Sequence, residues 1–337
     1  MGLRRYILRR LGLMIIVIWG LITITFIVSH VIPVDPVALW AGEKARMQEL
    51  DIIRKRYHLD EPLWRQYIYF FQDLLQGNLG ISPVTNRPVL QDLTYFFPAT
   101  FELALLSLIM VMALGILFGV FSALKRGSIT DHLLRIYSLT GTSMPIFWLG
   151  VMLQFVLYFS LDWLPLGGRI DAQWTRITGF VLLDTLIAGN LHGFLDAFKH
   201  MIMPAFCLSF SSMGLVVRIT RSSMLEVLGA DYIRTAKSKG LPKNVVIYKH
   251  VLKNALIPPL TALAWTFGNL LQGAMITETV FSWPGIGNYA ASAIYTLDFP
   301  AVMGFTILAG ISVVVVNLIT DLLYLFIDPR IRMLEAA

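Results

Sequence analysis

The sequence has few charged residues and almost no cysteine. Asp, Glu, Lys and Arg make up only 14% of the 337 residues, whereas a typical soluble domain has about 25%. Hydrophobic residues make up 56%, and the mean hydropathy is +0.69, so the composition is that of a membrane protein. Its single cysteine, Cys207, excludes a disulfide framework and a thiolate metal site built within the chain.

Nucleotide-binding and catalytic motifs are missing as well. The sequence contains no Gly-x4-Gly-Lys-Ser/Thr loop, no Gly-x-Ser-x-Gly elbow and no His-Glu-x-x-His pair. The six histidines are scattered, and no two have the spacing of metal ligands on one helix face. We therefore predict a chain that is not an enzyme and binds no metal. Membrane topology explains its net charge of +6 better than nucleic-acid binding does.

Six uncharged stretches are long enough, or nearly so, to cross about 30 Å of hydrocarbon. They cover residues 11–32, 103–124, 136–161, 201–217, 254–277 and 299–320. The fourth is short and interrupted by Pro204, and three further prolines predict breaks or kinks: Pro145, Pro258 and Pro259. The first stretch is too long for a signal peptide and no cleavage site follows, which favours an uncleaved anchor. The expected fold is an all-α polytopic membrane protein with six transmembrane helices.

The basic residues predict the orientation of these spans. Most Lys and Arg residues lie in the N-terminal segment, in two alternate loops (125–135 and 218–253) and near the C-terminus. The positive-inside rule places these segments and both termini in the cytoplasm. A seventh span around Asp184 would move the basic 218–253 loop outside. We therefore interpret Phe180 to Ile187 as a partly buried periplasmic segment.

The predicted topology divides the chain into three parts. Residues 1–32 form the cytoplasmic N-terminus and the first span. Residues 33–100 form a periplasmic cap, with helices expected around 47–57 and 64–75. Residues 101–337 form the core, which contains five spans and the cytoplasmic loop 218–258.

The 218–258 loop has a helix–glycine–helix pattern. Helix-forming residues run from Asp231 to Lys239, Gly240 fits a helix C-cap, and Pro242 fits the start of a second helix. A basic helix at this surface could meet lipid phosphates or dock on a partner protein. The pattern alone leaves both interpretations open.

This loop resembles the so-called EAA loop of ABC importer permeases. Thr235 and Ala236 occupy the small-residue positions and Gly240 the glycine position, whereas Arg234 and His250 depart from the general motif. Lys253 departs from it too, and these departures are the form expected in the dipeptide, oligopeptide and nickel branch. Within that branch the chain is most similar to the B-type subunit of dipeptide permeases. Other matching segments occur in order along the chain: Gly77–Ser82, Phe97–Thr100, Ser143–Phe147, Arg218–Leu228, Thr277–Gly287 and Asp328–Arg332.

The resemblance implies a type I importer fold and ATP-driven import by alternating access. The helix over about 229–239 would be a coupling helix that docks on a separate ATPase subunit. The coupling residues would be Asp231, Tyr232, Arg234, Thr235, Ala236, Lys237, Lys239, Gly240 and Leu241. The implied partners are a second homologous permease, two ABC ATPase subunits that carry ATP and Mg, and a periplasmic substrate-binding protein. The expected location is the bacterial inner membrane, with no cofactor and no nucleic acid bound by this chain.

Three acidic residues lie at membrane level: Glu102, Glu278 and Asp321. Glu278 is the best functional candidate because it opens the 277–287 segment at the external mouth. The candidates for the translocation path or external gate are Glu278, Phe281, Trp283, Pro284 and Gly285.

Dipeptides or short peptides are the expected solutes, and nickel or haem carried by the same machinery is the alternative. An ion-coupled secondary carrier would be expected to have inverted repeats and mid-membrane charges, and an intramembrane enzyme would need a catalytic pair in the spans. The sequence shows none of these features.

Overall fold

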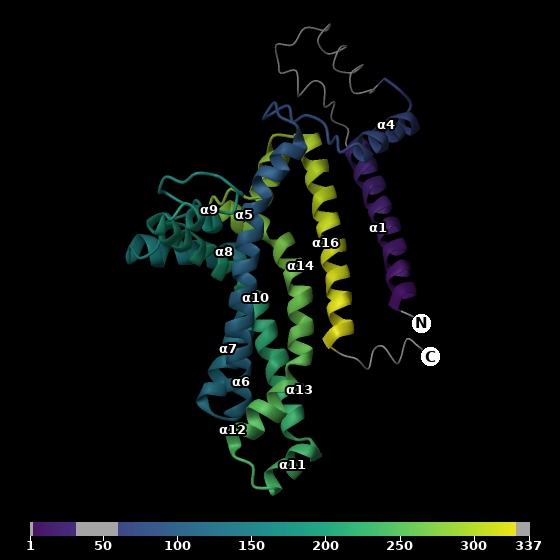
Figure 1. The fold of residues 1–337 in the computed structure, drawn as a ribbon. Coiled ribbons are helices and arrows are strands. Elements are labelled where there is room, and N and C mark those ends of the chain that lie inside the picture. Colours follow the sequence, from purple (N-terminus) through teal and green to yellow (C-terminus); the bar gives the residue numbers. More distant parts are fainter. Residues whose placement is uncertain (1–2, 32–59, 328–337) are drawn as a thin grey trace.

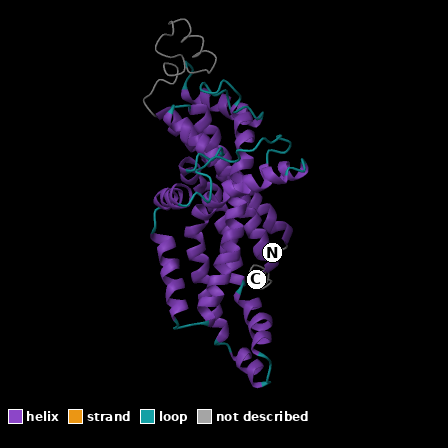
Figure 2. Ribbon diagram, turned by 90° about the vertical axis from the view of Figure 1, so that its left-hand side faces the viewer, coloured by secondary structure: helices purple, strands orange, loops and turns teal. Residues whose placement is uncertain are grey.

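The structure, a computed structural model, describes residues 3–31 and 60–327 and is built from helices, with no strand element in these ranges (Figures 1 and 2). Its long helices are α1 (Leu3–Val31), α5 (Val89–Met110), α10 (Leu191–Leu228), α14 (Ile257–Val280) and α16 (Phe299–Ile327). A π-helical turn, η1 (Val111–Gly115), joins α5 to α6 (Ile116–Leu124). Helix α7 (Ile129–Ser143) is followed by α8 (Ile146–Leu153) and η2 (Gln154–Ser160). The shorter elements are α4 (Leu63–Leu75), α9 (Val181–Ile187), α11 (Asp231–Ser238), α12 (Lys243–Val245), η3 (Val246–Leu252), α13 (Lys253–Ala255) and α15 (Ile286–Tyr295).

Each of the six predicted spans falls on one of these helices or helix pairs. By length and composition, three helices in the described ranges can cross a membrane: Val89–Leu124, Leu191–Leu228 and Phe299–Ile319. A fourth span results if the bent pair α7 and α8–η2 counts as one. The all-helical membrane fold is confirmed, whereas the count of six spans stays a prediction.

The third predicted span differs from the structure. The uncharged run 136–161 suggested one helix, but the chain bends by 111° between α7 and α8. Met144 is extended, with φ −81° and ψ 129°, and it precedes Pro145. Proline lacks an N–H and disfavours helical geometry in the residue before it, so the helix ends there and restarts in a new direction.

The fourth predicted span is much longer than the sequence suggested. Helix α10 has 38 residues and continues through Pro204 and past Arg218 to Leu228. The Asn190 side chain caps its N-terminus by accepting a hydrogen bond from the Gly193 N–H at 2.8 Å. Charged residues marked the limits of the uncharged run, but a helix can continue beyond the hydrocarbon into water.

The predictions for the cap region have mixed outcomes. Helix α4 confirms the helix expected around 64–75, and the helix expected around 47–57 lies outside the described residues. Helix α9 confirms the partly buried segment around Asp184, and with seven residues it is too short to cross a membrane. Helix α5 runs continuously through residues 100 and 101, where the sequence-based division separates cap from core.

Helix α10 lies at the centre of the bundle and organises its packing. About 61% of its most apolar window is buried, against 33% for Val89–Leu124 and 22% for Phe299–Ile319. It contacts α5, α6, α7 and α14, while α1 lies beside α16 (Figure 1). Apolar side chains on α1, such as Ile15 and Ile24, are more than half exposed and suit contact with lipid.

Candidate functional site

Helix α11 lies at the extreme end of the bundle, beyond the ends of α6, α7 and α10 (Figure 1). Its inner face consists of Ile233 and Ala236, which are buried. They pack in one apolar cluster with residues from α6, α10, η3 and α13: Ala123, Met224, Val246, Val251 and Ala255. The helix is therefore fixed on its own bundle and is not a loosely attached loop.

The outer face of α11 is polar and cationic. Most of the predicted coupling residues are exposed there or in the following turn: Asp231, Tyr232, Arg234, Thr235, Lys237, Lys239, Gly240 and Leu241. The Asn254 side-chain amide donates a hydrogen bond to the Tyr232 hydroxyl at 3.1 Å, which ties this face to the following helix. Ala236 lies on the inner face, where its small side chain packs against the other helices of this chain and not against a partner.

The turn after α11 has the geometry that the sequence pattern indicates. Gly240 has φ +73°, and its N–H donates to the Lys237 carbonyl at 3.0 Å. Pro242 then caps the helical run that begins at Lys243 and continues through η3 and α13. The predicted helix–glycine–helix pair is thus confirmed in conformation.

At the end of α14 that lies away from α11, Glu278 is fully buried in the segment 278–288. One carboxylate oxygen accepts from the Thr100 hydroxyl at 2.5 Å, and the other accepts from the Asn288 N–H at 2.9 Å. Asn288 lies in the first turn of α15, where free N–H groups favour a negative charge. The carboxylate therefore connects α5, α14 and α15.

The other predicted path residues lie in the same segment. Phe281 and Trp283 are fully buried, and the Trp283 indole N–H donates to the Ala99 carbonyl at 3.0 Å. Gly285 leaves no room for a side chain, because a Cβ there would lie 2.3 Å from Glu278 Oε1. Pro284 is half-buried. Glu278 and Trp283 bond to one turn of α5, whereas Phe281 packs against Met203 and Cys207 of α10.

A buried ion pair supports the same turn of α5. The Arg169 guanidinium contacts the Glu102 carboxylate, and both side chains are less than 10% exposed. Arg169 also donates to the Gly179 carbonyl at 2.7 Å, while Glu102 accepts from the Leu182 N–H at 3.0 Å. The sequence identified Glu102 as one of three acids at membrane level, but it gave no indication of its partner Arg169, which lies 67 positions away.

The segment leading into α9 folds around a buried carboxylate. Asp184 accepts hydrogen bonds from the Ile177 and Gly179 N–H groups, and from both the N–H and the hydroxyl of Thr178. Burial by itself would raise the pKa of Asp184, but these hydrogen bonds stabilise the anion and hold the pKa below its usual range.

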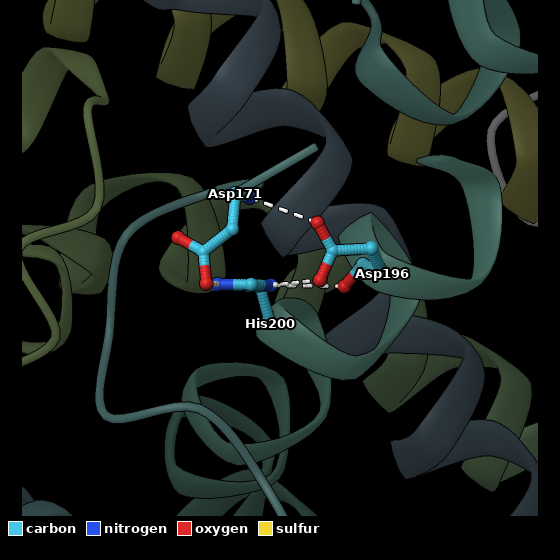
Figure 3. Close-up of side chains that lie close together, drawn as sticks. All are labelled: Asp171, Asp196 and His200. Atoms are coloured by element: carbon cyan, nitrogen blue, oxygen red, sulfur yellow. Dashed lines mark hydrogen bonds and ion pairs between the residues drawn. The ribbon is translucent and has the colours of Figure 1, made fainter. Parts of the chain in front are cut away.

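One cluster has residue types that can bind a metal: Asp171, Asp196 and His200 (Figure 3). The two carboxylates lie at opposite edges of the imidazole ring, 3.5 Å from Nε2 and 3.4 Å from Nδ1. Asp196 Oδ2 accepts from the N–H groups of Asp171 and Ala172, both at 2.8 Å. His200 Nδ1 also lies 2.9 Å from the Asp196 carbonyl oxygen, so hydrogen bonds join the three residues into a clamp between the 171–172 loop and α10.

Two family descriptions match the chain and together cover nearly all of it. "Binding-protein-dependent transport system inner membrane component" matches residues 115–333. The corresponding N-terminal component of such membrane proteins matches residues 3–104. The first match alone covers more than half of the sequence and includes α11.

Curated relatives are similar over almost their whole length. The probable D,D-dipeptide transport system permease protein DdpB of Escherichia coli K12 is 48% identical over 94% of each chain. The dipeptide transport system permease protein DppB of the same strain is 44% identical over 97% of this chain and 98% of its own. The di/tripeptide transport system permease protein DppB of Pseudomonas aeruginosa is also 44% identical, with the same coverage.

Proposed function

The chain belongs to the family of binding-protein-dependent transport system inner membrane components, and from this membership we propose its solute, its orientation and the way it is driven. It is the permease subunit of an ABC importer, a non-catalytic component of the inner membrane. The solutes we propose are dipeptides and other short peptides, because the relatives above carry peptide-transport names over nearly their full length.

The drive comes from separate ATPase subunits that dock on α11. One observation carries this proposal: α11 has a buried face fixed on α6 and α10 and an outer face of exposed cationic and polar residues. A fixed surface helix can pass a movement into the bundle, whereas a loose loop would absorb it. Because the sequence lacks a P-loop, ATP and Mg belong to the partner subunits, and this chain carries no cofactor.

The orientation follows from the basic loops: α11 and both termini lie in the cytoplasm and the 278–288 segment lies at the external side. There we assign Glu278, Phe281, Trp283, Pro284 and Gly285 to the external gate. The Glu278 carboxylate is occupied by Thr100 and Asn288, which supports a structural role in keeping the gate segment in shape.

The working assembly contains this chain, a second homologous permease, two ABC ATPase subunits and a periplasmic substrate-binding protein in the lipid bilayer. The family description supports the binding protein as a component. We propose a second permease because the described helices expose many large apolar side chains, which can pack against a partner bundle as well as against lipid.

Uptake by the reconstituted importer tests this proposal. Proteoliposomes that hold the complex, with ATP inside and the binding protein outside, should accumulate a radiolabelled dipeptide, and a non-hydrolysable ATP analogue should abolish accumulation. Unlabelled dipeptide should compete, whereas Ni²⁺ and haem should not. Accumulation of the labelled dipeptide without ATP would contradict the assignment. So would uptake that Ni²⁺ or haem inhibits and unlabelled dipeptide does not.

A further inference from the structure

Three helices pack unusually closely near the α11 end. A Cβ at Gly119 of α6 would lie 2.4 Å from the Thr220 Cβ on α10, and one at Gly214 of α10 would lie 2.6 Å from the Ser138 carbonyl on α7. The Ser138 hydroxyl donates to the Gly214 carbonyl at 2.6 Å. Such close backbone contacts leave no room for the helices to slide, so α6, α7 and α10 form one unit here.

A buried carboxylate fastens the same three helices. Asp131 of α7 is 1% exposed, and the Arg221 guanidinium of α10 contacts both of its oxygens, with Nε at 2.8 Å and Nη2 at 2.9 Å. The Ser122 hydroxyl of α6 donates to the same carboxylate at 2.6 Å, and the Gly127 N–H of the α6–α7 turn donates at 3.0 Å. Two-point arginine–carboxylate contacts are among the most directional interactions in proteins.

This contact lies directly beside the residues on which α11 rests. Ala123 follows Ser122 in α6, and Met224 lies one turn beyond Arg221 in α10. Ala123 and Met224 pack in the apolar cluster that holds Ile233 of α11. A force on α11 therefore enters α6 and α10 next to the Asp131 carboxylate.

We propose that the Asp131–Arg221 pair is the positioning contact that makes α6, α7 and α10 move together with α11. This inference rests on the proposed docking of ATPase subunits on α11. Without the pair, a stroke on α11 would displace the end of α10 while the α6–α7 turn lags behind. The expected defect is a loss of coupling: ATP is hydrolysed, but less peptide moves for each ATP.

The test measures ATP hydrolysis and dipeptide uptake together in proteoliposomes holding the complete importer. Arg221→Lys keeps the charge but loses the two-point contact, and Asp131→Asn removes the anion. We expect both variants to lower the peptide moved per ATP about fivefold or more while hydrolysis stays within about twofold. Arg218→Lys is the matched control, since Arg218 is exposed one turn away on the same helix, and it should leave the ratio unchanged.

The double variant Asp131→Asn with Arg221→Met completes a cycle. If the pair acts as a unit, the double variant is no worse than either single variant. Additive defects in the double variant would overturn the inference, and so would an unchanged amount of peptide moved per ATP in Arg221→Lys. Failure of every variant to assemble would also overturn it, because the pair would then be needed only for folding. Absence of ATP-driven uptake by the unaltered importer would instead reject the proposed function.

Discussion

At the scale of single residues, the two glycines that flank α11 differ in what they require. Gly240 has φ +73°, while Gly229 has φ −84°, which any residue adopts. A Cβ at Gly240 would meet nothing within 4 Å, so backbone conformation and not crowding calls for glycine there. Left-handed geometry costs other residues about 1–2 kcal/mol, with the greatest strain for β-branched side chains.

Gly240→Val should therefore abolish peptide uptake while the chain still reaches the membrane, because the strained turn shifts α11 from its docking position. Gly229→Val is the matched control and should keep uptake near the level of the unaltered importer. Uptake and membrane content measured in the same cells give the comparison. Normal uptake by Gly240→Val would argue against docking through this helix.

The buried pair of Arg169 and Glu102 gives a second comparison. Glu102→Gln leaves a buried guanidinium without its counter-charge, a change that costs about 3–5 kcal/mol. Glu61→Gln removes a solvent-exposed partner of Arg65, which is worth about 0–1 kcal/mol. Thermal unfolding of the purified protein in detergent should show a much lower unfolding temperature for Glu102→Gln and almost no change for Glu61→Gln. Equal shifts would contradict the burial of the pair.

These residues also show what a sequence can reveal. The turn at Gly240 is local, so glycine and proline spacing predicted it. The pairs Arg169–Glu102 and Asp131–Arg221 join residues 67 and 90 positions apart, and only the packing of helices brings them together. For the same reason Glu278 could be singled out as an acid near a span end, but its partner Thr100 could not.

At the scale of elements, α11 depends on its apolar inner face. Ile233 is fully buried, so Ile233→Ala should cost about 2–5 kcal/mol locally and detach the helix from α10. Fewer ATPase subunits should then co-purify with the permease. Val245→Ala, at an exposed β-branched residue of α12, is the control and should retain them. Full retention by Ile233→Ala would show that docking does not require this packing.

The prolines explain why helix positions were predictable and helix ends were not. Pro145 ends one helix and starts another, Pro204 lies inside a continuous helix, and Pro258 and Pro259 lie in the first turn of α14. The sequence marked all four as breaks or kinks. Whether a helix ends at a proline or continues through it depends on neighbouring helices, because these can supply a partner for the backbone group that loses its hydrogen bond.

At the scale of the whole molecule, two polar ends are joined by an apolar bundle. One end carries α11 on α6, α7 and α10, and the other gathers the 278–288 segment, Arg169 and Glu102 around one turn of α5. Helix α10 belongs to both ends, since its His200 is part of the clamp with Asp171 and its Arg221 lies towards α11. A movement of α11 can therefore reach the far end through a single continuous helix.

The central claim is that α11 is a cytoplasmic helix that touches an ATPase subunit. Cys207 is the only cysteine, so Cys207→Ala gives a background for single-cysteine labelling. In the assembled importer, a cysteine introduced by Lys237→Cys should react with an impermeant thiol reagent only from the cytoplasmic side and should cross-link to an ATPase subunit. Tyr295→Cys, at an exposed residue of the opposite end, should react only from outside. Labelling of Lys237→Cys from outside, or no cross-link in an active importer, would contradict the account.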